Sequence, residues 1–320
     1  MKLQTQVPLS KPERQIDYAS RILLLGSCFS ENIGGKLNYH QFQTEQNPFG
    51  ILFHPISIKN LILKAIEGYT YTEADIFYLN EQWHCFDAHS HLSAVSKEDL
   101  LNSLNGALES MGKWLRQASH IIITLGTAWV YVDKETEGVV ANCHKVPQKR
   151  FQKSLLTVAD VTRSLRSIVN EVSAINPTVN FVFTVSPVRH LKDGFVENQC
   201  SKAHLISAVH EVVGQSNNTQ YFPSYEIMMD ELRDYRFYTK DMVHPNEVAI
   251  DYIWEKFKGM WISDTVEETM KKVAEVEKGL QHRAFNPNSE AHRKFINSLD
   301  QKIDYLKKEY PFMNFDNRSL

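Results

Sequence analysis

The feature of this sequence that most restricts its fold is a series of short apolar runs separated by amphipathic stretches. The first run, Arg21-Ile-Leu-Leu-Leu25, leads directly into Gly26. A run without alternation is typical of a strand that is covered on both faces, as in a parallel sheet. Similar runs follow at residues 120–124 and 179–185, with a weaker one at 220–222.

Amphipathic helices are predicted between these runs. Ser96 and Thr157 each precede a helical pattern, with Asp99 and Asp160 in position to complete the N-terminal caps. Two further helices are predicted, one over residues 201–213 and one starting at Pro245, because Pro is favoured at the first helical position. Strands that alternate with helices predict an α/β fold, a three-layer α/β/α sandwich with a central parallel sheet.

The predicted α/β domain spans residues 1–262 and has two interruptions. Residues 69–93, rich in Tyr, Trp and His, predict a lid or an additional small sheet, and residues 129–140 predict a β-hairpin. Residues 263–320 predict a C-terminal helical extension, a hairpin of two helices with a turn at 285–289. This helical hairpin is expected to pack on the core or on a second subunit, which would give a homodimer.

Charge and composition exclude several functions. The chain has 35 Lys and Arg against 38 Asp and Glu, a net charge of -3, so no broad cationic field favours nucleic acid or anionic lipid. The N-terminus lacks the apolar segment of a signal peptide, and no apolar run reaches the roughly 18 residues of a membrane helix. We expect a cytoplasmic protein.

The 4 cysteines have no CxxC spacing, and neither a metal nor another cofactor is expected.

The strongest candidate for chemistry follows the first predicted strand. Cys28 stands in Gly26-Ser-Cys-Phe-Ser30, where a helix is expected to begin. A helix N-terminus stabilises a thiolate and can offer a backbone N–H to a developing oxyanion. The alternative is structural, with Cys28 as a small buried apolar residue and Ser27 as the N-cap.

A second candidate lies downstream in Asp241-Met-Val-His244-Pro245. An Asp that accepts the Nδ1 proton of a His fixes its tautomer and leaves Nε2 free to act as a general base. The alternative is again structural, with Asp241 as a turn residue and His244 near the helix cap. A nucleophile near the N-terminus followed by Asp and His is the order expected of a nucleophile, acid and base set in an α/β fold.

Six short motifs occur in order along the chain. They are Gly26-Ser-Cys-Phe-Ser30, Asn47-Pro-Phe-Gly50, Thr124-Leu-Gly-Thr-Ala-Trp129, Asn142-Cys-His-Lys145, Ser186-Pro-Val-Arg189 and Asp241-Met-Val-His244-Pro245. Together they resemble the GSCFA domain family, which is grouped with the SGNH (GDSL-like) hydrolases. The similarity covers roughly residues 20 to 260 and implies an SGNH-hydrolase-like, flavodoxin-like fold.

The resemblance also implies catalytic roles. It places Cys28 at the position of the nucleophilic Ser of SGNH hydrolases, although a one-residue shift would give the role to Ser27. Asp241 and His244 match the last motif of the superfamily. Gly50 resembles the Gly whose N–H helps to form the oxyanion hole.

One expected residue is missing. The third block of the superfamily supplies an Asn amide, but Gly126-Thr-Ala128 contains none. We expect Asn142, His144 or Thr127 to provide this donor instead. The side chains of His144, Lys145, Arg189 and His190 are candidates for binding substrate, unless they are solvated surface residues.

These observations predict an SGNH-like hydrolase or acyltransferase. Its substrate would be an ester, a thioester or an acylated carbohydrate, and it would form a covalent acyl-enzyme. The alternative is a non-catalytic protein that retains the SGNH pocket to bind a carbohydrate or a nucleotide-like ligand. Hydrogen bonds from Cys28 or Ser27 to His244, and from His244 to Asp241, would favour the enzyme.

Overall fold

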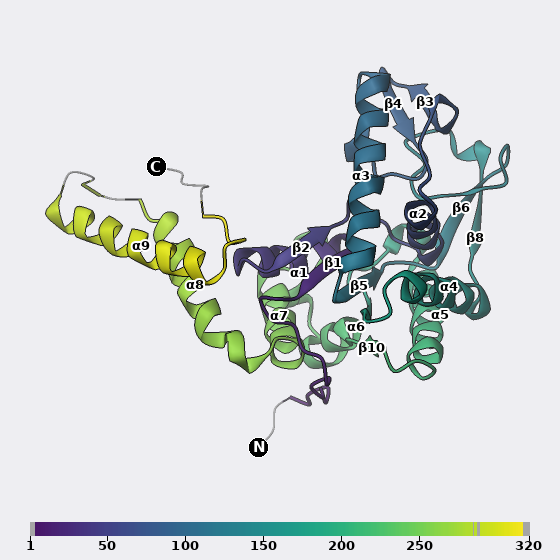
Figure 1. Cartoon of the computed structure of the whole chain (residues 1–320). Helices are drawn as coiled ribbons and strands as arrows, with labels where there is room; N and C mark the ends of the chain where they lie inside the picture. The colour runs from purple at the N-terminus through teal and green to yellow at the C-terminus, as the bar shows by residue number, and fades with distance from the viewer. Residues whose placement is uncertain (1–3, 284, 287–288, 316–320) are drawn as a thin grey trace.

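A sheet of parallel strands forms the centre of the molecule (Figure 1). The computed structural model describes residues 4–283, 285–286 and 289–315. Within these residues the central sheet has five strands in the order β10-β9-β5-β1-β2, a flavodoxin-like order. The strands are β1 (Arg21–Gly26), β2 (Gln43–Gln46), β5 (His120–Leu125), β9 (Asn180–Val185) and β10 (Thr219–Tyr221).

Helices cover both faces of this sheet. Leu23 and Leu25 of β1 belong to one apolar cluster and Ile22 and Leu24 to another, because successive strand residues point to opposite faces. The predicted three-layer sandwich is therefore confirmed. One layer contains α2 (Pro55–Glu67), α3 (Lys97–Gln117), α4 (Val158–Ile175) and α5 (Phe195–Val213), and the other contains α1 (Cys28–Tyr39) and α7 (Glu247–Trp261).

Two helix starts are as predicted. The Ser96 hydroxyl accepts a hydrogen bond from the Asp99 N–H at 3.2 Å, at the start of α3. Thr157 and Asp160 form a capping box at the start of α4. These polar pairs satisfy N–H groups that have no partner within the helix.

Two other helix starts were predicted wrongly. Helix α7 begins at Glu247 rather than Pro245, because the side chain of Asn246 accepts from the Ala249 N–H at 3.1 Å and is the cap. Helix α5 begins at Phe195, upstream of residue 201. Phe195 and Val196 are exposed, so the first turn of α5 lacks the amphipathic pattern that would reveal it.

Both interruptions of the domain form small sheets. Residues 69–93 contain an antiparallel hairpin of β3 (Ile76–Leu79) and β4 (Gln82–Cys85). The predicted hairpin consists of β6 (Trp129–Asp133) and β7 (Val139–Val140), and β8 (Phe151–Leu155) pairs with its other side. The Ala141 N–H donates to the Phe86 carbonyl at 2.8 Å, so the two insertions are connected.

The C-terminal helices form an arm that projects from the sandwich (Figure 1). The arm consists of α8 (Glu267–Leu280) and α9 (Glu290–Glu309), as the sequence predicts. Leu299, Ile303 and Leu306 belong to the same buried cluster as residues of α8, α7 and α1. The turn predicted at 285–289 includes residues 287–288, which lie outside the described residues.

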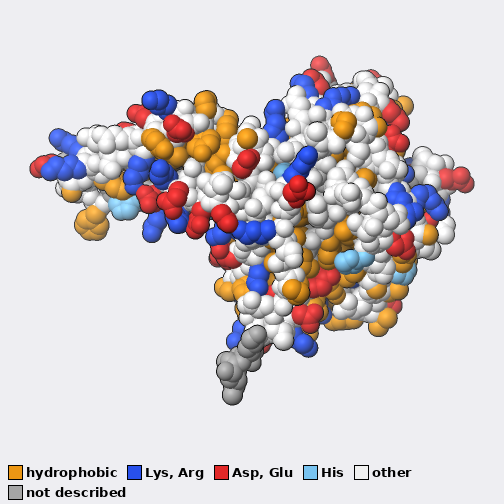
Figure 2. Space-filling view, turned by 60° about the horizontal axis from the view of Figure 1, so that its bottom comes forward, with side chains coloured by type: hydrophobic (Ala, Val, Ile, Leu, Met, Phe, Trp, Pro, Cys, Tyr) orange, Lys and Arg blue, Asp and Glu red, His pale blue; other side chains and the backbone are white. Residues whose placement is uncertain are grey.

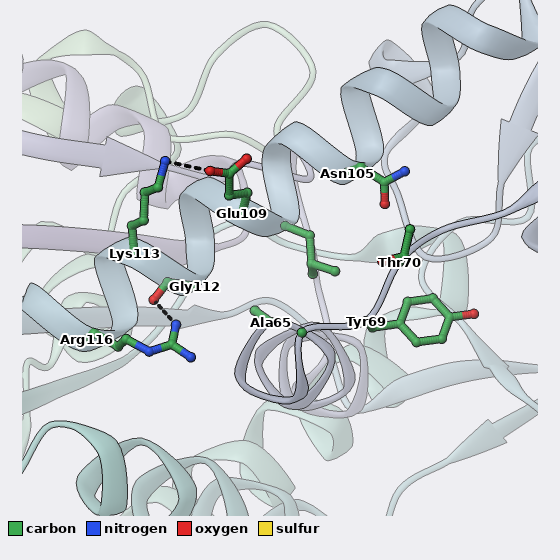
Figure 3. Close-up of a pocket in the computed structure, with 10 residues that line it drawn as sticks. Ala65, Tyr69, Thr70, Asn105, Glu109, Gly112, Lys113 and Arg116 are labelled. Carbon is green, nitrogen blue, oxygen red and sulfur yellow. Dashed lines mark hydrogen bonds and ion pairs between the residues drawn. The ribbon is translucent and has the colours of Figure 1, made fainter.

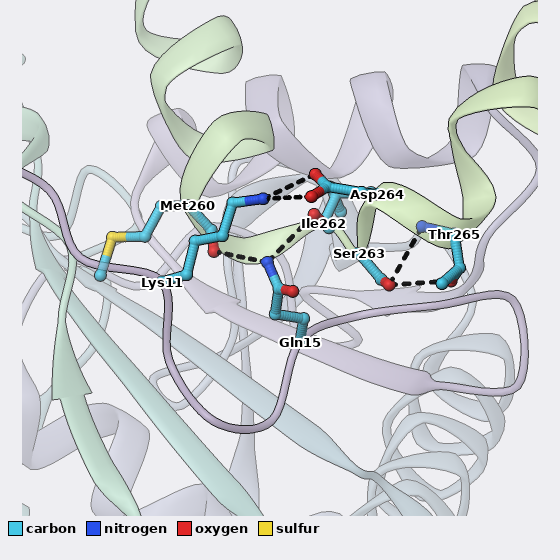
Figure 4. A network of polar contacts seen from close by, with 7 residues as sticks. All are labelled: Lys11, Gln15, Met260, Ile262, Ser263, Asp264 and Thr265. Carbon is cyan, nitrogen blue, oxygen red and sulfur yellow. Dashed lines mark hydrogen bonds and ion pairs between the residues drawn. The ribbon is translucent and has the colours of Figure 1, made fainter.

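An N-terminal segment fixes the junction between α7 and the arm (Figure 4). Lys11 binds both carboxylate oxygens of Asp264 at 2.6 Å. The Gln15 amide donates to the carbonyls of Met260 at 3.1 Å and Ile262 at 3.2 Å. Four polar contacts therefore anchor the residues from which the arm departs.

Basic and acidic side chains are interspersed over the face in Figure 2, with no large region of one sign. No helix of the described residues has the length and apolar character needed to cross a membrane.

The remaining short helices are η1 (Glu73–Asp75), η2 (Ser90–Leu92), η3 (Gln148–Arg150), η4 (Leu191–Asp193), α6 (Ser224–Glu226), η5 (Ile227–Leu232), η6 (Tyr235–Phe237) and η7 (Asp264–Val266).

Candidate active site

A tight turn at the end of β1 places Cys28 at the start of α1. Gly26 has a φ of 130°, and a Cβ at this position would lie 2.1 Å from the Thr124 carbonyl oxygen of β5. The Gly26 N–H donates to the Asn47 side chain at 2.8 Å, and the Ser27 N–H donates to the Thr124 carbonyl at 3.0 Å. This turn requires glycine and makes Cys28 the first residue of α1.

Cys28 is partly exposed at the carboxyl edge of the sheet. Burial and the Glu31 carboxylate raise the pKa of the Cys28 thiol above its ordinary value. The backbone N–H groups of Cys28 and Phe29 and the Lys202 ammonium oppose this increase of the pKa. The thiol is therefore protonated near neutral pH, and a reaction at Cys28 would need a base.

Ser27 is the less accessible of the two candidate nucleophiles. Its side chain is completely buried, and its hydroxyl has no hydrogen-bond partner among the described residues. Ser27 occupies the N-cap position of α1, but its side chain makes no capping hydrogen bond. A substrate would reach Cys28 more easily than Ser27.

Asp241 and His244 form the predicted pair. The His244 Nδ1–H donates to the Asp241 carboxylate at 2.6 Å. The same carboxylate accepts from the N–H groups of Val243 at 2.8 Å and His244 at 3.0 Å, and from the Thr239 hydroxyl at 2.6 Å. The Thr239 hydroxyl and these other donors hold the pKa of Asp241 well below its usual range. Both side chains of the pair are about half exposed.

The second predicted contact is absent. Within the described part of the chain, neither Cys28 nor Ser27 makes a hydrogen bond with His244. The loop of His244 is nevertheless attached to the sheet edge, because the Arg189 N–H, after β9, donates to the Val243 carbonyl at 3.1 Å. The structure thus has the pair on the expected edge, and within the described residues it makes no hydrogen bond to Cys28 or Ser27.

Two further side chains interact electrostatically with the candidate residues, Lys202 with Cys28 and His190 with His244. Lys202 of α5 is buried, and its ammonium donates to the carbonyls of Gly126 at 2.8 Å and Ser186 at 2.6 Å. Burial lowers the pKa of Lys202 to about 7, although the nearby Cys28 opposes this effect. Burial, Lys202 and His244 lower the pKa of His190 to about 3, so this imidazole is neutral.

Sequence reasoning missed Lys202. Lys202 lies three residues before Leu205, on the buried face of α5. The other buried residues of this face include Asn198, Ser201, Leu205 and Ala208. This position was the feature of the sequence that could have identified Lys202. A charged residue on an otherwise buried helix face is rare unless it has a specific partner. The helix predicted over residues 201–213 contained Lys202, but the position of this lysine on the buried face was not used.

The predicted oxyanion donors are occupied. The Gly50 N–H donates to the Asn47 carbonyl at 2.7 Å, and the N–H of Thr127 donates to the Phe53 carbonyl at 3.0 Å. The Thr127 hydroxyl is hydrogen-bonded to the Ser201 hydroxyl at 3.0 Å. The N–H groups of Gly50 and Thr127 and the Thr127 hydroxyl therefore already have partners in this structure.

Asn142 and His144 lie in the inserted sheets. The Asn142 side chain accepts from the His144 N–H at 2.9 Å. The His144 Nε2–H donates to the Cys85 carbonyl at 2.7 Å, and the ring packs near His84 and Phe86. Burial is the main cause that lowers the pKa of His144 to about 4. No hydrogen bond among the described residues connects either side chain to Cys28.

The other predicted substrate-binding residues have different surroundings. The Arg189 guanidinium donates to the Met242 carbonyl at 3.0 Å and lies against the ring of Tyr238, so it holds the loop of His244. Lys145 is exposed on a turn. His190 lies beside Gly126 at the edge: an added Cβ on Gly126 would be 3.1 Å from its Nε2, which has no hydrogen-bond partner among the described residues.

A separate hollow of about 470 Å³ lies between α2 and α3 (Figure 3). It contains none of the candidate residues. Lys113 pairs with Glu109 at 2.7 Å, and Arg116 donates to the Gly112 carbonyl at 2.8 Å, so these charged groups are already partnered. Two neighbouring histidines, His89 and His91, lie beside Gly50 and outside this hollow, with their Nδ1 atoms 3.0 Å apart. Across the described residues, no group of three or more His, Cys, Asp or Glu is arranged to hold a metal ion.

A comparison with protein families matches residues 21–257 to the GSCFA family. The chain belongs to the GSCFA family. The C-terminal domain of GSCFA domain proteins matches residues 273–318, which include most of the arm of this GSCFA protein. A comparison with curated proteins gave no match.

Two solved structures have some likeness to this GSCFA protein. A Streptococcus pneumonia protein, provisionally described as a platelet activating factor, is 10% identical, with a TM-score of 0.40 over 75% of this chain and 83% of the other. A carbohydrate esterase family 3 protein from Talaromyces cellulolyticus is 8% identical, with a TM-score of 0.37 over 79% of this chain and 98% of the other. Likenesses at these scores do not assign an activity.

Proposed function

We propose that this GSCFA protein is an SGNH-like hydrolase or acyltransferase that forms a covalent acyl-enzyme at Cys28. The observation that carries the proposal is the shared location of Cys28 and the Asp241–His244 pair. Cys28 follows β1, and the loop of His244 is hydrogen-bonded to the segment after β9. The carboxyl ends of parallel strands are where open α/β sheets bind ligands.

The proposed reaction has two steps. First, Cys28 Sγ bonds to the acyl carbon while its proton passes to His244 Nε2, and the leaving oxygen or sulfur then departs with that proton. In the second step, water or a hydroxyl acceptor loses a proton to His244 and attacks the thioester. The Cys28 thiol leaves and regains its proton. Asp241 holds the His244 ring and stabilises the imidazolium in both steps.

The N-terminus of α1 would stabilise the oxyanion. The Cys28 and Phe29 N–H groups face the sulfur. His190 Nε2, which is unpartnered among the described residues, would be a second donor in its N–H tautomer. His244 has to approach Cys28 when substrate binds, and catalytic contacts often form only in such complexes. The substrate would be an ester, a thioester or an acylated carbohydrate.

A non-catalytic binding protein is the second candidate. The absence of a hydrogen bond between His244 and Cys28 in the described structure favours it, as do the occupied N–H groups of Gly50 and Thr127. Such a protein would use the same edge to bind a carbohydrate or a nucleotide-like ligand without turnover.

Acyl-enzyme formation distinguishes the two candidates. The full chain is incubated with p-nitrophenyl acetate or an acetyl thioester, and the peptides are analysed by mass spectrometry. We expect an acetyl group on Cys28 that is lost in Cys28→Ala and kept in the matched control Ser27→Ala. An adduct that persists in Cys28→Ala and is lost in Ser27→Ala would transfer the role to Ser27. No adduct with either donor would favour the binding protein.

A further inference from the structure

The buried ammonium of Lys202 interacts with the candidate nucleophile Cys28 and has no carboxylate partner among the described residues. The Lys202 side chain is 1% exposed. Its hydrogen bonds go to two carbonyl oxygens, and no ion pair to Lys202 occurs within the described residues. Its other near neighbour is the ring of Tyr225, whose centre lies 5.7 Å from Nζ. Burying a charge without a counter-ion is costly, so retaining a lysine here needs an explanation.

The hydrogen bonds place this ammonium at the edge that carries Cys28. Gly126 follows β5 and Ser186 follows β9, and β5 lies between β1 and β9 in the sheet. Gly26 is the register partner of Thr124, and the Ser27 N–H donates to the same Thr124. Neighbouring strands are about 4.8 Å apart. The ammonium is therefore about one strand away from the position where Cys28 would become an anion.

The electrostatic coupling between the two groups is mutual. Lys202 is among the groups that lower the pKa of Cys28, and Cys28 is the one group that raises the pKa of Lys202 against burial. A purely structural tie between two strand ends would need only a hydrogen-bond donor. A neutral amide would provide that donor without the cost of a buried charge.

We propose that Lys202 is a positioning residue of the Cys28 site, whose ammonium holds the ends of β5 and β9 and compensates the negative charge that forms when Cys28 reacts. The inference rests on the proposed function in one respect only, that Cys28 is the reactive group. It specifies where the compensating charge originates, and it applies to any reaction in which Cys28 becomes a thiolate.

Alkylation of Cys28 tests this role without an acyl donor. In this reaction the thiolate bonds to the methylene carbon of iodoacetamide, iodide leaves, and the thiol proton goes to solvent. The rate at Cys28 is followed by peptide mass spectrometry between pH 6 and pH 10.5. Three variants of the full chain are compared with the wild type: Lys202→Met removes charge and donors, Lys202→Gln keeps a donor, and Lys202→Arg keeps both.

We expect the rate of alkylation at Cys28 to be about tenfold lower in Lys202→Met and Lys202→Gln at pH 6 to 7, where Lys202 of the wild type still carries its proton. Lys202→Arg should remain within about threefold of the wild type, as should the control Lys153→Met. Lys153 pairs with Asp193 at 2.5 Å on the inserted sheet, so this control removes a positive charge elsewhere. Thermal unfolding and circular dichroism establish which variants fold.

Two outcomes would overturn the proposal. If Lys202→Gln folds and Cys28 reacts as in the wild type, the charge is not needed and Lys202 is only a tie between strands. If both neutral variants fail to fold, the role of Lys202 is structural. A failed acyl-enzyme experiment leaves this test intact, because alkylation requires neither turnover nor His244.

Discussion

Substituting Gly26 by Ala tests whether the turn after β1 builds the site. A Cβ at Gly26 would lie 2.1 Å from the Thr124 carbonyl oxygen, 2.8 Å from its carbon and 2.9 Å from the Thr124 nitrogen. All three atoms belong to the backbone of β5, which cannot move aside as the end of a flexible side chain can. The strand ends would have to separate by roughly an ångström in a close-packed interior.

Two costs add in Gly26→Ala. A φ of 130° is strained for a residue with a Cβ, which costs about 1–3 kcal/mol. The overlap with β5 costs about another 1–3 kcal/mol, as overpacking in a core does. Together these costs lower the expected free energy of unfolding by about 2–6 kcal/mol. Alkylation of Cys28 should change as well, because the turn positions α1.

Urea denaturation measures this loss, and Gly35→Ala is the matched control. Gly35 lies in α1, and an added Cβ there would have no atom within 4 Å. Alanine is the better helix former, so we expect this control to be stabilised by about 0.5–1 kcal/mol. A Gly26→Ala protein within about 0.5 kcal/mol of the wild type would refute the steric reasoning.

Three further predictions follow from the contacts. Asp241→Asn should slow acylation by about 100-fold or more, measured as the rate of adduct formation, because the His244 tautomer is no longer fixed. The pKa of Asp241 is depressed in the folded protein, so its stabilising effect is present above the ordinary carboxyl pKa and lost only as the pH falls through the depressed value. Acid titration of the wild type against Asp241→Asn, by circular dichroism, should show their stabilities converging at low pH. Arg189→Met releases the Met242 carbonyl and should reduce acylation more than stability, which the two assays applied to one sample would reveal. Ile303→Ala should destabilise the arm by about 2–5 kcal/mol, seen as faster hydrogen exchange in α8 and α9, because its side chain is buried between helices.

The strands that the sequence predicted most clearly are those buried on both faces, although it also predicted the partly buried β10 and the hairpin of β6 and β7. β1, β5 and β9 are continuous apolar runs because helices cover each side of the sheet. β2 (Gln43–Gln46) was missed, since this edge strand is polar and only half buried and has no run of apolar residues. Its pairing is specified by contact with β1 rather than by its own composition.

The site was predictable only where its residues are close in sequence. Asp241 and His244 are three positions apart, so one loop brings them together and the sequence predicted their pairing. The approach of Lys202 to Cys28 depends on how α5 crosses the sheet, which no local pattern encodes. The same limit applies to Arg189, whose guanidinium reaches the Met242 carbonyl from a loop after β9.

The hydrogen bonds at the sheet edge explain how acyl transfer could proceed without the missing Asn amide. The Phe53 carbonyl takes the N–H groups of Gly126 and Thr127, so the backbone where that amide would stand is used to close the fold. A substrate oxygen is then left with the N-terminus of α1, where N–H groups converge on Cys28. In its protonated form, the buried Lys202 adds a full positive charge to the partial charge of this helix end. In the proposed reaction, a side-chain amide is replaced by a helix terminus and a buried cation.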